Sequence, residues 1–114
     1  MLKSKYLIAA VAFLGAAYAA PASAQSFSCM NAEEMSAAEQ RICASRHLQA
    51  LDERLDHWYR RALVRARYFD QTEEVRSAQR AWLASRNACA GRFWCLRRHY
   101  VTRIYQLKTY VEHV

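Results

Sequence analysis

From Gln25 to the C-terminus the sequence contains no proline and one glycine, Gly91. A domain built from β-strands needs turn residues at intervals of about 8 to 12 positions, and this segment lacks them. Residues that favour the helix dominate it instead, chiefly alanine, arginine, leucine, glutamine and glutamate. Its roughly 90 residues are enough for one small domain. We therefore predict an all-α fold, a small antiparallel bundle of three to four helices.

The first 24 residues have the features of a cleaved signal peptide. Residues 1–6 are basic, residues 7–20 are an apolar run without a charge, and residues 22–24 read Ala-Ser-Ala, the small-x-small pattern of a cleavage site. The apolar run is shorter than the roughly 20 residues that a transmembrane helix needs. We predict a signal peptide at 1–24, a helical domain at 25–114 and no transmembrane span in the mature chain.

The residues before Cys29 read Ser-Phe-Ser, which is not the Leu-small-small run that precedes a lipidated cysteine. We therefore expect a soluble periplasmic or secreted protein rather than a lipoprotein. An even number of cysteines in a small exported chain also predicts a disulfide framework.

The mature chain carries a positive charge made almost entirely of arginine. The whole chain has 17 basic and 10 acidic side chains, and loss of Lys3 and Lys5 with the signal peptide leaves 15 against 10, a net charge of +5. Because an exported protein rarely meets nucleic acid, we expect no nucleic-acid partner, and the positive charge favours anionic cell-wall or membrane components instead. Arg54, Arg61 and Arg65 recur at helical spacing and could form one basic face, or they could be ordinary solvated side chains.

Four helical segments follow from the caps and the apolar spacing. Ser36 and Glu39 form a capping box that opens a short helix ending near Cys43. Ser45 caps a long helix that runs to about Phe69. The apolar face of this long helix consists of Leu48, Leu51, Leu55, Trp58, Ala62 and Ala66.

The last two helices follow short connections, which predict antiparallel neighbours. Residues 70–73 offer a cap for the third helix, which should end at Ala90–Gly91, where the glycine can take the left-handed conformation. Its inner side is expected to carry Val75, Ala78, Trp82 and Cys89. The fourth helix should run from about Phe93 to the C-terminus. Its residues in register are Phe93, Leu96, Tyr100, Ile104, Leu107 and Val111.

The cysteines could hold zinc, act as a redox dithiol or staple the helices. Zinc prefers ligand pairs two to four residues apart, and a redox pair normally has its cysteines three apart at a helix N-terminus. Neither spacing is present here. Three pairings are open to four cysteines, and we favour the local one, Cys29–Cys43 with Cys89–Cys95, because it leaves each loop short. A loop of about 15 residues closed by a disulfide contributes about 3 kcal/mol of stability.

Several charged and aromatic residues adjoin the apolar faces. We expect Trp82, Tyr59 and Tyr100 to be core residues, the tyrosine hydroxyls reaching partners. Asp52 is placed to pair with either Arg86 or Arg103 across two helices, a contact that would fix their register. The alternative is separate, solvated charges.

The segment after Gly91 combines aromatic and basic side chains. An exposed Trp94 beside its neighbours would make a contact patch for a partner, whereas burial of Trp94 beneath the loop would not. The residues of this candidate patch are Arg92, Phe93, Trp94, Arg97 and Arg98.

Catalysis finds little support in the sequence. The histidines are scattered, no His-Glu-x-x-His pair occurs, and no glycine-rich loop could cradle a phosphate. The carboxylate doublets, at 33–34 and 73–74, are adjacent and so point to different sides of a helix. We expect no enzyme activity, no cofactor and no metal.

A set of motifs in the mature chain resembles a known family. The first half comprises Phe27-Ser-Cys29, the run from Ala38 to Cys43, and Leu48 to Asp52 followed by Leu55 and Tyr59. The second half comprises Gln79 to Leu83, Arg86-Asn-Ala-Cys89, Cys95-Leu96, Tyr100 and Arg103-Ile104. Together they resemble the family of small exported bacterial proteins named after the lysozyme inhibitor LprI.

This resemblance implies a helical exported domain with paired cystines that binds c-type lysozyme or another envelope protein. Inhibition would be non-covalent, by occlusion of the substrate cleft. The alternative function is an envelope interaction protein that binds anionic components through its arginines.

Overall fold

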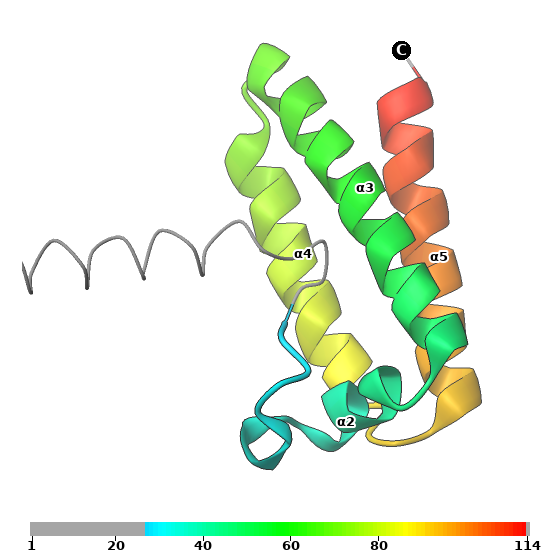
Figure 1. Cartoon of the computed structure of the whole chain (residues 1–114). Helices are drawn as coiled ribbons and strands as arrows, with labels where there is room; N and C mark the ends of the chain where they lie inside the picture. The colour runs from blue at the N-terminus through cyan, green and yellow to red at the C-terminus, as the bar shows by residue number, and fades with distance from the viewer. Residues whose placement is uncertain (1–26, 114) are drawn as a thin grey trace, which may run out of the picture.

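The computed structural model describes residues 27–113, so the expected signal peptide at 1–24 lies outside the described residues. The described part contains a 3₁₀ turn and four α-helices and has no strand (Figure 1). These elements are η1 (Ala32–Glu34), α2 (Ala37–Cys43), α3 (Arg46–Tyr68), α4 (Thr72–Asn87) and α5 (Phe93–Glu112). The predicted all-α fold is confirmed.

The three long helices run antiparallel to their neighbours in the chain, and the short α2 lies at the end of the bundle where α4 stops and α5 starts (Figure 1). Helix α3 packs along α5 and also contacts α2 and α4. No helix within residues 27–113 is long and apolar enough to cross a membrane.

The four predicted helix starts agree with the structure, and two of the three predicted side-chain caps form. At α2, the amide of Glu39 donates to Ser36 Oγ (3.2 Å) and the amide of Ser36 donates to Glu39 Oε1 (3.0 Å), the expected capping box. At α3, the amide of Leu48 donates to Ser45 Oγ (3.2 Å). The third N-cap lies within the expected residues 70–73, at Gln71, but the Gln71 side chain makes no capping hydrogen bond.

The end predicted for the third helix also needs correction. Helix α4 stops at Asn87, and the left-handed residue is Ala90 (φ 53°) rather than Gly91. The reason is the turn that follows: the amide of Arg92 donates to the carbonyl of Cys89 (3.3 Å), and this closed turn places its positive φ at its second residue.

The core lies between α3 and α5, with α2 and α4 packed against it. Its buried residues include Leu48, Leu51, Leu55 and Ala62 of α3 and Leu96, Tyr100, Ile104 and Leu107 of α5, as the apolar spacing predicted. Ala78, expected on the inner side of α4, is exposed. Gln79 and Arg86 are buried instead, because the inner face of α4 includes polar side chains that find partners inside the bundle.

The local disulfide pairing is confirmed. Cys29 is bonded to Cys43 at the end of α2, and Cys89 is bonded to Cys95 in the first turn of α5. The second bond joins the segment after α4 directly to the start of α5. Both staples therefore act near the end of the bundle that holds α2 (Figure 1).

Candidate functional site

A buried polar centre joins the helices beneath α2. Asp52 and Arg86 are each 1% exposed, and the hydroxyl of Tyr100 donates to Asp52 Oδ1 at 2.8 Å. Arg86 Nη1 lies 4.0 Å from the same oxygen and 3.4 Å from the Tyr100 hydroxyl. The structure thus brings Asp52 next to Arg86. Arg103 lies elsewhere and donates from Nε to Gln79 Oε1 at 3.0 Å.

Arg86 is the hub of this centre. Its Nη2 lies 3.7 Å from Glu39 Oε2 of α2, and its guanidinium stands over the rings of Phe27 (5.2 Å) and Trp82 (5.7 Å). Burial and the Asp52 carboxylate raise the pKa of Tyr100 far above its usual range, so the hydroxyl stays a donor. The centre therefore locks α2, α3, α4 and α5 in register.

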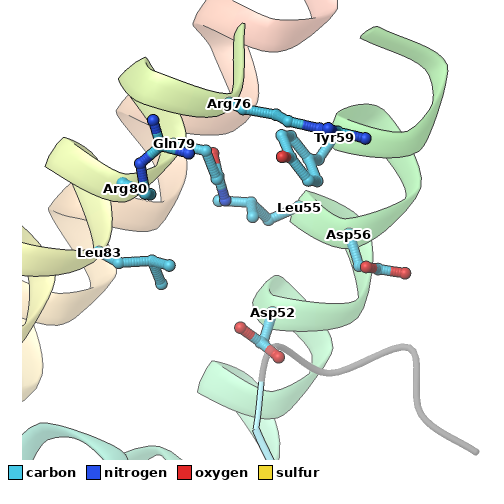
Figure 2. A pocket seen from close by; sticks show the side chains of 8 residues that line it. All are labelled: Asp52, Leu55, Asp56, Tyr59, Arg76, Gln79, Arg80 and Leu83. Atoms are coloured by element: carbon cyan, nitrogen blue, oxygen red, sulfur yellow. The ribbon is translucent and has the colours of Figure 1, made fainter. Parts of the chain in front are cut away.

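A groove of about 270 Å³ separates α3 from α4 (Figure 2). It is lined by Asp52, Leu55, Asp56, Tyr59, Arg76, Gln79, Arg80 and Leu83. Partial burial raises the pKa of Asp56, while Arg60 at 2.9 Å opposes that shift. Arg80 is also engaged, since it donates to Glu73 at 2.7 Å. The groove combines half-buried Tyr59 with paired charges and presents no nucleophile beside a base.

The first turns of α5 carry aromatic and basic side chains next to the Cys89–Cys95 disulfide. We call Arg92, Phe93, Trp94, Arg97 and Arg98 the α5 tip surface. Trp94 is 70% exposed, so the loop does not cover it. Its ring meets the partly buried ring of Phe93 edge to face, with centroids 5.0 Å apart. The flat Trp94 ring is thus exposed to solvent and packs against the partly buried Phe93 ring.

Side chains from α2 and α3 support this surface. The guanidinium of Arg41 lies 5.5 Å from the centroid of the Phe93 ring, and the His47 ring lies 5.9 Å from it. Arg97 Nε donates to His47 Nε2 at 3.2 Å, which ties α5 to the start of α3. The sequence did not link Arg41 or His47 to the surface, because only tertiary packing brings them there.

Of the three arginines expected to form a basic face on α3, Arg54 and Arg61 are exposed and Arg65 is partly buried. Arg65 is partly buried and stacks over the rings of Phe69 (4.8 Å) and Tyr110 (5.3 Å). Arg61 stacks over Trp58 at 5.1 Å. Arg61 and Arg65 thus cover apolar rings with their guanidinium groups.

The Cys89–Cys95 disulfide has a histidine beside it. Ligand atoms of Cys89, Cys95 and His99 lie within 4.8 Å of one another, the one potential metal-binding group within residues 27–113. Both sulfurs are consumed by the disulfide, and metal ligation needs thiolates. The oxidised protein therefore offers no cysteine ligand at this point.

Comparison with protein families gives one match, to the model described as lysozyme inhibitor LprI, over residues 29–107. The chain belongs to the LprI family. The LprI match contains both disulfides, the buried polar centre and the whole α5 tip surface. Comparison with curated proteins and with solved structures found no match. The family is therefore established, whereas no match identifies the residues through which this domain acts.

Proposed function

We propose that the protein is an exported lysozyme inhibitor that blocks the enzyme without covalent chemistry, by covering its substrate cleft with the α5 tip surface. The observation that carries the proposal is the LprI match over residues 29–107, which includes that surface. Inhibition by occlusion needs no catalytic group of the inhibitor's own.

Export places the domain where lysozyme acts. Residues 1–24 serve as the cleaved signal peptide, and the mature domain works in the periplasm or outside the cell. Two disulfides in a domain of this size are typical of oxidising compartments and support this location.

The chemistry of the α5 tip surface suits a glycosidase cleft. Such a cleft binds sugar rings, and glycoside hydrolases work with a pair of carboxyl groups beside the scissile bond. Trp94 offers a flat ring for the apolar walls of the cleft, and Arg97 and Arg98 offer guanidinium groups that pair well with carboxylates. The complementarity is local, between the arginines of the tip and the acids of the cleft.

The surface is also held in place before binding. The Phe93 ring, the Arg97–His47 bond and the Cys89–Cys95 disulfide each restrain the first turns of α5. A partner then spends little free energy on ordering these side chains, which favours tight binding by a small surface.

The test is lysozyme activity on cell-wall substrate with increasing amounts of the oxidised mature domain. Saturable inhibition is expected. Trp94→Ala should raise the inhibition constant at least about tenfold. The matched control is Tyr68→Ala, which removes an aromatic ring of similar exposure (84%) at the far end of α3 and should leave inhibition unchanged. Absence of inhibition by the folded, oxidised domain would refute the proposal.

Salt distinguishes the alternative function, adhesion to anionic cell-wall or membrane components. Binding of a mature domain of charge +5 to an anionic polymer weakens steeply as salt screens the attraction. Binding to a basic lysozyme keeps or gains affinity, because salt screens the repulsion between two positive proteins. Affinity measured for both partners between low and physiological salt separates the two functions.

A further inference from the structure

The two cysteines of the Cys89–Cys95 disulfide differ in their exposure to solvent. Cys89 is 1% exposed, whereas Cys95 is partly exposed in the first turn of the 20-residue helix α5. An incoming thiolate can therefore reach the sulfur of Cys95, and the sulfur of Cys89 would be the one to leave. This is the division of roles that thiol–disulfide exchange requires.

His99 is placed to stabilise the sulfur that leaves. Its Nδ1 lies 3.3 Å from Cys89 Sγ and 3.9 Å from Cys95 Sγ. Nδ1 also lies 2.8 Å from the carbonyl oxygen of Cys95, which can only accept, so Nδ1 carries the proton. The Ser85 hydroxyl then donates to Nε2 at 2.9 Å and fixes the ring. A hydrogen-bond donor thus stands next to the position where a Cys89 thiolate would form.

Positive charge favours attack at Cys95. Arg92 Nη2 lies 3.8 Å from Cys95 Sγ, and Arg92 Nε is held by the carbonyl of Cys89 at 3.0 Å. The N-terminal end of α5 adds the positive end of a helix dipole at the same place. Both attract an anionic thiolate to the exposed sulfur, and both stabilise a thiolate on Cys95 after the bond opens.

We propose that Cys89–Cys95, with His99 and Arg92, is a thiol–disulfide exchange site for small thiols and dithiols, a reactive site in addition to the proposed inhibitor function. The sequence spacing had argued for a staple alone. The side chains around the sulfurs, which the spacing could not reveal, make the same bond reactive.

A dithiol reduces the disulfide in two steps. One thiolate of the dithiol attacks Cys95 Sγ, a mixed disulfide forms, and the Sγ–Sγ bond breaks with its electron pair on Cys89. The Nδ1–H group of His99, which donates to the carbonyl oxygen of Cys95 while the disulfide is intact, is shared with that thiolate in a three-centre hydrogen bond. The second thiolate of the dithiol attacks the mixed disulfide and releases Cys95 as a thiolate. The dithiol loses two electrons and becomes a disulfide, and its two protons pass through solvent to Cys89 and Cys95.

The second disulfide of the same chain is an internal reference. Cys43 Sγ has the thioether of Met35 as a neighbour at 3.8 Å, and a thioether cannot donate a hydrogen bond. Cys29 is exposed and Cys43 partly so, which means that access alone would favour opening of Cys29–Cys43. Faster opening of Cys89–Cys95 would therefore be caused by the side chains around it and not by its exposure.

The test exposes the oxidised mature domain to dithiothreitol under native conditions, with timed alkylation of free thiols and peptide mapping of both disulfides. Cys89–Cys95 is expected to open at least about tenfold faster than Cys29–Cys43. His99→Leu should slow that opening about tenfold, the effect of losing a hydrogen bond to a charged group. His99→Asn, whose amide can still donate from near the Nδ1 position, should remain within about threefold of the original rate.

Two further variants complete the design. Arg92→Gln, at an exposed position, should slow the opening at least about threefold without altering the fold. His57→Leu, which replaces an exposed histidine on α3, should change nothing. The proposal is overturned if Cys29–Cys43 opens first. It is equally overturned if His99→Leu reacts like the original protein, or if the leucine and asparagine variants are slowed alike.

Discussion

Replacing Asp52 by alanine should destabilise the domain by about 3 kcal/mol. The change removes the charged acceptor of the Tyr100 hydroxyl at 2.8 Å, and a hydrogen bond to a charged group contributes about 1.5–3 kcal/mol. It also removes a carboxylate 4.0 Å from the buried Arg86 guanidinium. Loss of one partner of a buried charge costs about 3–5 kcal/mol. Glu39, 3.7 Å from Arg86, stays in place and keeps the total near the lower end.

Urea unfolding of the oxidised mature domain, followed by circular dichroism, measures this loss. In thermal unfolding, the melting temperature should fall by roughly 15 °C, because a loss of 1 kcal/mol in the free energy of unfolding lowers it by about 4–8 °C in a domain of this size. Tyr100→Phe removes the other end of the same hydrogen bond. The loss of stability in the double variant should be smaller than the sum of the two single losses by at least about 1 kcal/mol.

Asp56→Ala is the matched control. Asp56 lies one turn further along α3, but its partner Arg60 has a side chain that is 64% exposed. An ion pair with one solvent-exposed partner is worth little more than an exposed pair, which contributes about 0–1 kcal/mol, so this variant should lose less than about 1 kcal/mol. Equal losses for the two aspartates, or additive losses for Asp52→Ala and Tyr100→Phe, would refute the view that the polar centre is a coupled lock.

Three more predictions follow from single features of the fold. Ala90→Gly should stabilise the domain by about 1 kcal/mol in urea unfolding, because Ala90 has a φ of 53°, whereas Gly91→Ala should be tolerated, since an added Cβ meets nothing within 4 Å. Because the pKa of Tyr100 is raised, the folded state keeps a proton that the unfolded state loses above about pH 10; stability should therefore fall with rising pH there, less steeply in Tyr100→Phe. Removal of Cys29–Cys43 should cost about 3 kcal/mol and removal of Cys89–Cys95 about 2 kcal/mol, since the loop closed by the first is longer (sequence separations 14 and 6).

The fold was predictable because its determinants are local. A capping box at Ser36 and a cap at Ser45 mark two helix starts, and three-four spacing of leucines marks the inner face of α3. The errors occur where tertiary contacts override local preference. Apolar spacing predicted that Ala78 lies on the inner face of α4. Gln79 is buried instead, and its side-chain oxygen accepts a hydrogen bond from Arg103 of α5. A polar residue is assigned to the core only when its partner is known.

The candidate site was predictable in composition but not in construction. The sequence named Trp94 and its arginines, yet gave no sign that His47 would bond Arg97 from 50 residues away. It offered Arg86 or Arg103 as the partner of Asp52, yet did not indicate which one, or that Tyr100 would complete the contact. Contacts between distant segments depend on the relative position of packed helices, which periodicity does not specify.

The restraints of this small domain are concentrated at one end. Both disulfides, the charged contact of Arg86 with α2 and the hydrogen bond between Tyr100 and Asp52 lie in the half of the bundle that includes α2 and the start of α5. The opposite end exposes Tyr68 and Phe69 and is held mainly by packing and the Tyr110–Gln71 hydrogen bond. Local unfolding should therefore be easier at the end of the bundle that holds Tyr68 and Phe69 than at the end that holds Trp94. Because an inhibitor binds more tightly when its contact surface is already ordered, this uneven distribution favours the α5 tip surface as the functional end.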